Sequence, residues 1–182
     1  MAGTFDGRPR RDRDEGKSDA SSRGGASRVP IESPRRGRTI DHVILLVEDN
    51  EDDAALALRA FRKHEPNREI HVAEDGVVAL EFLHGKPGAS PSAPLPRVVL
   101  LDLKLPKLDG FQVLERIRHE PRTSNLPVVM LTSSAEHTDI ERSYALGANS
   151  YVRKPISFVE FLDAAKQLGD YWLSLNLTAP QG

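Results

Sequence analysis

The sequence predicts an α/β fold, a doubly wound parallel sheet of five strands that alternate along the chain with five helices. Two observations predict this class. Short runs that are apolar at nearly every position recur between residues 39 and 169, which is typical of parallel strands buried on both faces. Between these runs, apolar residues recur at helical spacing. Sheets of this kind bind ligands beyond the carboxyl ends of their strands, so a functional site is expected there.

The first two strand–helix units occupy residues 40–83. Residues 40–47, IDHVILLV, become continuously apolar and β-branched, which predicts a buried strand. An acidic run then leads into a helix with the apolar spacing of LALRAF, residues 56–61, which ends near Glu65 and Pro66. A short second strand is expected at 69–73. Asp75 and Gly76 open the second helix, over 77–83.

The third unit contains the stretch VVLLDLKLPKLDG, residues 98–110. A loop rich in Gly, Pro and Ser over 85–96 precedes a strand at 97–101, and this strand runs directly into Asp102. The third helix starts near Asp109 and Gly110. Its apolar residues Phe111, Leu114 and Ile117 then recur at helical spacing.

The last two units follow the same pattern. PVVML, residues 127–131, predicts the fourth strand, and a helix containing Ile140 and Tyr144 is closed by Gly147, a residue favoured just past a helix end. The fifth strand is expected at 149–152. Ser157 then caps a long last helix.

The first 38 residues differ in composition from the rest of the chain. They hold ten Lys and Arg against six Asp and Glu, a net charge of +4, whereas residues 39–182 hold fifteen against twenty-one, a net charge of −6. Residues 1–38 contain few large apolar side chains, so they cannot bury enough surface to offset the entropy of ordering, and we predict that they are disordered. No aromatic–basic interleaving marks them as a nucleic-acid site.

The composition also limits the compartment and the chemistry. The chain has no cysteine, which excludes disulfides and thiolate metal sites. No apolar run approaches the ~20 residues of a membrane-spanning helix. The basic N-terminus lacks the apolar core of a secretory signal. A cytoplasmic protein is therefore expected, without a membrane partner.

Polar side chains follow four of the predicted strands. Glu48 and Asp49 follow the first, Asp102 the third and Thr132 the fourth, and Lys154 lies at the end of the fifth. Three carboxylates brought together repel one another, and a hard divalent cation such as Mg²⁺ offsets that cost. A carboxylate beside a cation, an ammonium and a hydroxyl is suited to receiving a phosphoryl group, because an aspartate can be the nucleophile.

Four motifs together resemble the receiver domain of two-component response regulators, the chemotaxis-regulator-like family. They are LLVEDN (45–50), LLDLKLPKLDG (100–110), VVMLTSS (128–134) and YVRKP (151–155), and the resemblance covers nearly all of residues 40–168. It implies a receiver domain at 39–169, a sheet in the strand order 2-1-3-4-5, and a signalling protein that is not an enzyme but promotes its own phosphorylation and dephosphorylation.

The resemblance also implies a role for each matched residue. Asp102 is the expected phosphoacceptor, and Lys154 would pair with the phosphoryl group. Mg²⁺ would be held by Glu48, Asp49, Asp102 and the backbone carbonyl of Lys104. Thr132 and Tyr151 would form the switch pair, and a cis peptide bond is expected before Pro155. In this family, the positions held here by Lys104 and Ser134 influence the lifetime of the phosphoryl group, and Lys104 is the expected modulator in this chain.

Other interpretations remain open for individual residues and for the whole chain. Asn50, Glu51, Asp52 and Asp53 need only a structural role, since a helix start favours a cap and negative charge. The protein could be a receiver-like scaffold that works without phosphorylation. It could instead be a phosphatase with an aspartyl nucleophile. Such enzymes have a second aspartate two residues after the nucleophile, a position that is Lys104 in this chain.

The chain beyond the receiver suggests its assembly and its donor. Residues 170–182 are expected to extend the last helix and end in a tail, and the apolar spacing continues through Tyr171, Trp172 and Leu175. An aromatic stripe without a core to cover suggests a homodimer anchored by these three residues. The alternative is that Tyr171 and Trp172 fold back onto their own domain.

The tail, the long loop before the third strand and the lack of room for a DNA-binding output domain resemble small regulators that partner bacterial phytochrome histidine kinases. The resemblance implies such a kinase as the phosphodonor and no nucleic-acid partner.

Overall fold

The computed structural model describes residues 43–64, 66–89 and 94–178. These residues belong to one unit, Arg38–Gly182. The segment predicted to be disordered, 1–38, lies outside the described residues.

Five strands form one parallel sheet in the order β2-β1-β3-β4-β5, which confirms the predicted fold class and strand order. Their bounds are β1 Ile44–Val47, β2 Ile70–Ala73, β3 Val98–Leu101, β4 Val128–Thr132 and β5 Ser150–Arg153. Every residue of β1, β3 and β4 is buried, as their continuous apolar sequences predicted.

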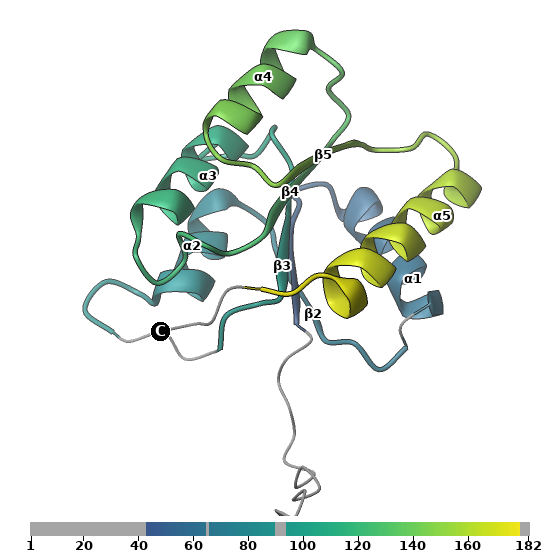
Figure 1. Cartoon of the computed structure of the whole chain (residues 1–182), viewed down its shortest axis with the longest axis horizontal. Coiled ribbons are helices and arrows are strands. Elements are labelled where there is room, and N and C mark those ends of the chain that lie inside the picture. Colours follow the sequence, from purple (N-terminus) through teal and green to yellow (C-terminus); the bar gives the residue numbers. More distant parts are fainter. Residues whose placement is uncertain (1–42, 65, 90–93, 179–182) are drawn as a thin grey trace, which may run out of the picture. The chain divides into compact units, whose positions relative to one another are not determined.

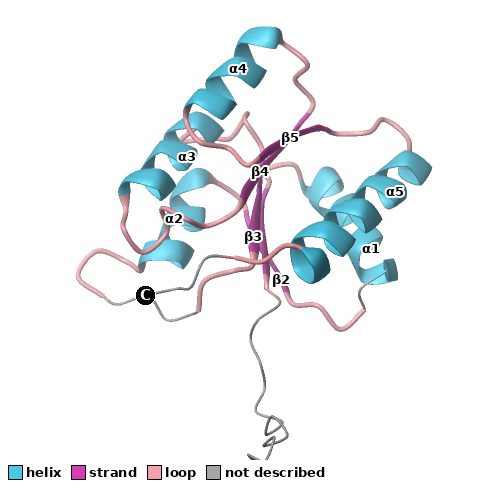
Figure 2. Cartoon of the chain, viewed as in Figure 1, coloured by secondary structure: helices cyan, strands magenta, loops and turns pink. Residues whose placement is uncertain are grey.

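Helices cover both faces of the sheet (Figures 1 and 2). Their bounds are α1 Glu51–His64, α2 Gly76–His84, α3 Gly110–His119, α4 His137–Ala145 and α5 Phe158–Gly169. One core lies between the sheet and the side of α2 and α3, and includes Leu83, Leu101 and Ile117. The second lies on the side of α1 and α5, and includes Leu46, Phe61 and Phe161.

Capping residues set the starts of most helices. Asn50 accepts hydrogen bonds from the backbone N–H groups of Asp52 and Asp53 at 2.9 and 3.0 Å. With this cap, α1 begins at Glu51, five residues before Leu56, where the apolar helical spacing starts. Asp109 and Gln112 form a capping box at the start of α3. Ser157 caps α5 as predicted, through the N–H of Glu160.

The chain continues past α5 as a short π-helix, η1, at Asp170–Leu175. The helical conformation therefore extends through Leu175, as the apolar spacing predicted, but its hydrogen-bond pattern changes at Asp170. None of the helices in the described part of the chain is long and apolar enough to cross a membrane.

The structure corrects the prediction that Trp172 lacks a core to cover. Its side chain packs into the same cluster as Phe61 and Phe161, and only 8% of it is exposed. Arg97 holds this segment by donating to the carbonyl oxygens of Trp172 and Asn176, the latter at 2.6 Å. Trp172 is thus a core residue of its own domain, and the apolar spacing misled because it does not reveal which surface a helix covers. Tyr171 and Leu175 are 51% and 72% exposed.

Candidate functional site

The register of the sheet brings the polar residues at the strand ends together. Val47 pairs with Leu101, so Glu48 and Asp102 follow the ends of adjacent strands. On the other side of β3, Thr132 pairs with Arg153, the residue before Lys154. Parallel strands place their carboxyl ends on one edge, and the predicted site residues lie there.

Lys154 lies at the centre of the polar side chains that gather at the carboxyl ends of the strands. Its ammonium Nζ lies 2.5 Å from Glu48 Oε2, 2.7 Å from Asp102 Oδ2 and 3.0 Å from Asp53 Oδ2. An ammonium has three N–H donors, and these three carboxylates match that number. Glu48 and Asp102 are buried, and only 9% of the Lys154 side chain is exposed, so charge pairing offsets the cost of removing these groups from water.

Burial and charge pairing shift the pKa values in this cluster. Burial raises the pKa of Glu48, and the ammonium of Lys154 offsets only part of that shift. Burial alone would lower the pKa of Lys154, but the hydrogen bonds from its ammonium to Asp102 and Glu48 outweigh burial and raise that pKa. Lys154 is therefore a permanent cation at physiological pH.

Asp102 is held by the backbone that follows it. Its Oδ1 accepts hydrogen bonds from the N–H groups of Leu103 at 2.6 Å and Lys104 at 3.3 Å, while Oδ2 faces Lys154. Gly110 passes so close behind Asp102 that a Cβ there would overlap the Asp102 carbonyl oxygen. A glycine is required at this position because the start of α3 packs directly against the loop that carries Asp102.

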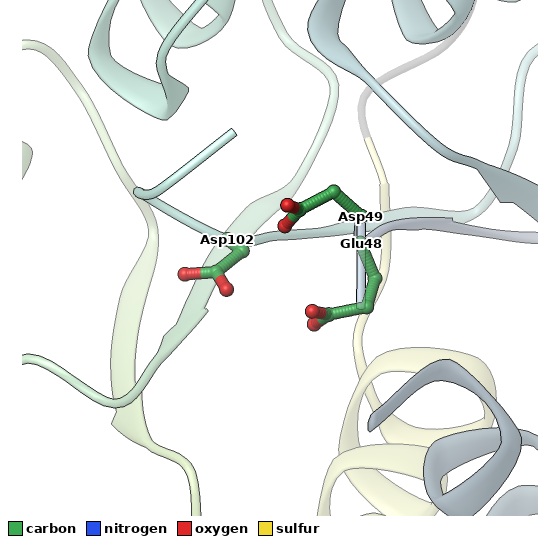
Figure 3. Close-up of side chains that lie close together, drawn as sticks. All are labelled: Glu48, Asp49 and Asp102. Carbon is green, nitrogen blue, oxygen red and sulfur yellow. The ribbon is translucent and has the colours of Figure 1, made fainter. Parts of the chain in front are cut away.

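Three carboxylates form a group that fits a hard divalent cation. One oxygen each of Glu48, Asp49 and Asp102 lie within 4.8 Å of one another, and Figure 3 shows Glu48 and Asp49 projecting from the same strand end toward the side of Asp102. Oxygen donors alone, two of them from buried residues, match the preference of Mg²⁺ or a similar cation. The described residues thus bring together the predicted carboxylate ligands.

Thr132 and Tyr151 lie on adjacent strands. Thr132 is fully buried, and its Oγ1 accepts a hydrogen bond from the N–H of Ser134 at 3.3 Å. The Tyr151 hydroxyl donates to the carbonyl oxygen of Ser134 at 3.1 Å, and burial raises the pKa of that hydroxyl. Ser134 also donates to Asp139 at 2.6 Å, which ties the loop after β4 to the start of α4.

The structure gives no support for the predicted roles of the Lys104 side chain and Pro155. It does show one contact that the sequence did not reveal. The Lys104 side chain is exposed, and the cis bond before Pro155 stays a prediction. Asp53 pairs with Lys154, a residue 101 positions away in the chain. Nothing in the sequence separates Asp53 from the other acids at the start of α1, because negative charge is favoured there in any case.

The family follows from this geometry and from comparison with known proteins. A sequence profile described as "Response regulator receiver domain" matches residues 44–166. The chain therefore belongs to the response regulator receiver domain family, whose members take up a phosphoryl group on an aspartate.

Individual relatives show which response regulators of this family the chain resembles. The chain is 35% identical over 138 residues to the response regulator Rcp1 of Synechocystis, covering 76% of this chain and 92% of Rcp1. A crystal structure of the Mn²⁺-bound form of Rcp1 superposes with a TM-score of 0.69, at 33% identity over 76% of this chain and 99% of that one. The chain is thus related to response regulators of the Rcp1 type.

Two further relatives bear on function. The phosphorylated cyanobacterial phytochrome response regulator RcpA has a TM-score of 0.72 and 34% identity, over 77% of this chain and 99% of that chain. The probable methanogenesis regulatory protein FilR2 of Methanothrix harundinacea is 42% identical over 134 residues, 74% of this chain and 85% of FilR2. The chain is therefore related to phytochrome response regulators and also to a regulator named for another process.

Proposed function

We propose that Asp102 accepts a phosphoryl group from a histidine kinase and that the resulting charge changes the surface formed by α4, β5 and α5. The observation that carries this proposal is the arrangement around the Lys154 ammonium. It contacts Asp102 at 2.7 Å and Glu48 at 2.5 Å, and both of these carboxylates belong to the group that fits a divalent cation.

In the proposed step, a carboxylate oxygen of Asp102 attacks the phosphorus of a phosphohistidine. A P–O bond forms and the P–N bond breaks. The electron pair of that bond stays on the imidazole nitrogen, which takes up a proton. Lys154 follows the transferred group and neutralises part of its charge. The receiver thereby promotes its own phosphorylation. Attack by water on the phosphorus then breaks the P–O bond to Asp102, releases inorganic phosphate and restores the free carboxylate.

Glu48, Asp49 and Asp102, together with the backbone carbonyl of Lys104, are the residues that we propose hold Mg²⁺. When bound, the cation would supply positive charge for the oxygens of the transferred group. The closeness of the three carboxylates supports this proposal, as does the Mn²⁺-bound form of the related Rcp1.

The switch is proposed to run through Thr132 and Tyr151. A phosphoryl oxygen on Asp102 would accept a hydrogen bond from the Thr132 hydroxyl. Movement of Thr132 toward that oxygen would break the hydrogen bond that the Ser134 N–H now donates to Thr132 Oγ1. Movement of Thr132 would free space for the Tyr151 ring, whose hydroxyl is tied to the same loop. Phosphorylation then shifts the population between two arrangements, because it stabilises one of them more than the other.

A bacterial phytochrome histidine kinase is the proposed phosphodonor, and a homodimer the proposed assembly. The first proposal is supported by the relationship to RcpA and the second by the exposed side chains of Tyr171 and Leu175. Phosphotransfer from a purified phytochrome kinase, compared with transfer from a kinase of another sensory class, tests the choice of donor. Equal rates from both would remove the support for a phytochrome partner.

Asp102 and Asp109 provide a matched pair for testing the acceptor. Asp102→Asn removes the proposed nucleophile, whereas Asp109→Asn alters the cap of α3, which faces solvent. After incubation with Mg²⁺ and acetyl phosphate, intact-mass measurement should show the phosphoryl adduct in the wild type and in Asp109→Asn but not in Asp102→Asn. An adduct of equal yield in Asp102→Asn would refute the assignment.

Asp49 tests the metal site because it is the exposed member of the carboxylate group and can be removed without opening the core. Asp49→Ala should bind Mg²⁺ about tenfold more weakly or worse, as expected for the loss of a direct carboxylate ligand. Asp52→Ala, which removes an acid of α1 outside the group, is the control and should bind normally. Equal affinity in the wild type and in Asp49→Ala would place the cation elsewhere.

A further inference from the structure

Asp53 differs from the other two carboxylates that contact Lys154. Glu48 and Asp102 are buried and belong to the group that fits a cation, whereas Asp53 is 44% exposed, lies on α1 and is outside that group. Its distance to the ammonium, 3.0 Å, is nevertheless within hydrogen-bond range.

The two buried partners of Lys154 cannot both keep their present contacts during the proposed reaction. Asp102 loses its free carboxylate when it becomes an acyl phosphate, and a cation beside Glu48 competes with the ammonium for that carboxylate. Asp53 takes part in neither change. It is therefore the one of the three partners in a position to stay with Lys154 from the free state to the phosphorylated state.

We propose that Asp53 is a positioning residue for the phosphoryl transfer. It holds the Lys154 ammonium at the site while the other two carboxylates change partners. This inference rests on the proposed function. α1 supports the role structurally, because Asn50 caps the helix through the N–H of Asp53 itself and so fixes the backbone from which the carboxylate extends.

Two opposite electrostatic effects are expected at Asp53, and their sizes decide the sign of a substitution. Its negative charge repels an incoming phosphoryl group, but its exposure lets water screen that repulsion. Its direct contact with Lys154 acts at 3.0 Å on a side chain that is 9% exposed and therefore less screened. The holding effect outweighs the repulsion, so removal of the carboxylate slows the reaction.

Asp52 provides a matched control. It precedes Asp53 in the same helical turn, its N–H donates to the same Asn50 oxygen, and its carboxylate forms no ion pair within the part of the chain that the structure describes. Asp52→Ala and Asp53→Ala therefore remove the same charge from the same helix start, and only the second removes a contact with Lys154.

The experiment measures the rate of phosphorylation by acetyl phosphate across a Mg²⁺ titration for the wild type, Asp52→Ala, Asp53→Ala and Asp53→Glu. Asp53→Ala should lower the rate at saturating Mg²⁺ about three- to fivefold, as expected for a partly exposed ion pair, with an unchanged Mg²⁺ concentration at half-saturation. Asp53→Glu should recover part of the rate, and Asp52→Ala should match the wild type.

Three results would overturn the inference while leaving the proposed function intact. The first is an equal rate in Asp53→Ala and Asp52→Ala. The second is a faster rate in Asp53→Ala than in the wild type, which would show that repulsion dominates. The third is a shifted Mg²⁺ dependence in Asp53→Ala, which would assign Asp53 to the cation. A wild type that takes up no phosphoryl group from any donor would instead refute the proposed function, and the inference with it.

Discussion

Asp75 shows how one buried carboxylate can serve two elements at once. Only 2% of the residue is exposed, and its Oδ1 accepts the N–H of Val78 at 2.8 Å, which caps α2. Its other oxygen pairs with the ammonium of Lys107, a residue with a positive φ of 65° in the loop that follows Asp102. Asp75 therefore links the start of α2 to the loop of the phosphoacceptor.

These contacts lower the pKa of Asp75 below its ordinary value of 3.8, with the hydrogen bond from Lys107 as the main cause. A lowered pKa contributes stability that is present above pH 3.8 and is lost as the pH falls through the pKa of the folded state. Asp75→Ala should lower the free energy of unfolding at pH 7 by about 1 kcal/mol through loss of the cap. The difference from wild type should shrink at pH 3.

Urea denaturation of both proteins at pH 7 and pH 3 measures this difference. Asp109→Ala is the control, because it removes the cap of α3, which Asp109 forms with the backbone N–H of Gln112. A gap between Asp75→Ala and the wild type that widens in acid would contradict the expected sign of the pH dependence.

At the scale of elements, the loop after β3 is held by the close approach of two helix starts. Gly110, the first residue of α3, lies against the backbone of Asp102 and Leu103, and Gly76, the first residue of α2, lies against Leu108. In each case a Cβ would meet another atom at less than 3.0 Å. The position of Asp102 therefore depends on how tightly these helices dock and not only on the strand that ends there.

Gly110→Ala tests this dependence. The added methyl group has no space, so the loop must shift, and we expect a loss of about 1–3 kcal/mol in the free energy of unfolding together with weaker Mg²⁺ binding. Gly88→Ala is the control, because nothing lies within 4 Å of a Cβ there and only its φ of +80° resists the change. It should cost roughly 1 kcal/mol and leave Mg²⁺ binding unchanged. Normal Mg²⁺ binding by Gly110→Ala would show that the loop tolerates the shift.

At the scale of the whole molecule, the burial of Trp172 changes the way in which assembly must be tested. Removing the chain after Gly169 would take away Trp172 and Leu173, both buried in the core beside α1 and α5. Such a truncation would unfold part of the domain and could not separate assembly from stability. Leu175 is exposed and Tyr171 half-exposed, with its ring edge-on to Trp172 at 4.9 Å between centroids, so changing them costs far less than removing Trp172 and Leu173.

The double substitution Tyr171→Ser and Leu175→Glu should dissociate the proposed dimer while leaving the free energy of unfolding of the monomer nearly unchanged. Each large apolar side chain buried in an interface contributes about 1.5–3 kcal/mol, so the dissociation constant should rise by at least tenfold. Trp172→Ala should instead lower stability by about 3–5 kcal/mol, the usual cost of emptying a core site. Sedimentation at high micromolar concentration checks the first outcome and thermal unfolding the second. A wild type that sediments as a monomer would refute the dimer.

The sequence by itself determined the class of fold, and it was sufficient to predict that the main residues of the candidate site lie close together. Runs of apolar residues marked β1, β3 and β4 because parallel strands in the middle of a sheet are buried on both faces. Since parallel strands end on one edge, the residues after them had to meet, and Glu48, Asp102 and Lys154 do meet. Periodicity and spacing are local properties, and these conclusions required nothing more.

Only the tertiary structure decided which surface each remaining side chain meets. Trp172 has the helical spacing of an interface residue, yet the core on the α1 and α5 side takes it up. Asp53 has the composition of an ordinary helix start, yet it reaches Lys154 across 101 positions of sequence. Asp75 and Lys107, 32 positions apart, join two loops that no local pattern connects. The physical reason is the same in each case: spacing records which face of an element is apolar or charged, whereas the partner of that face depends on how distant elements pack.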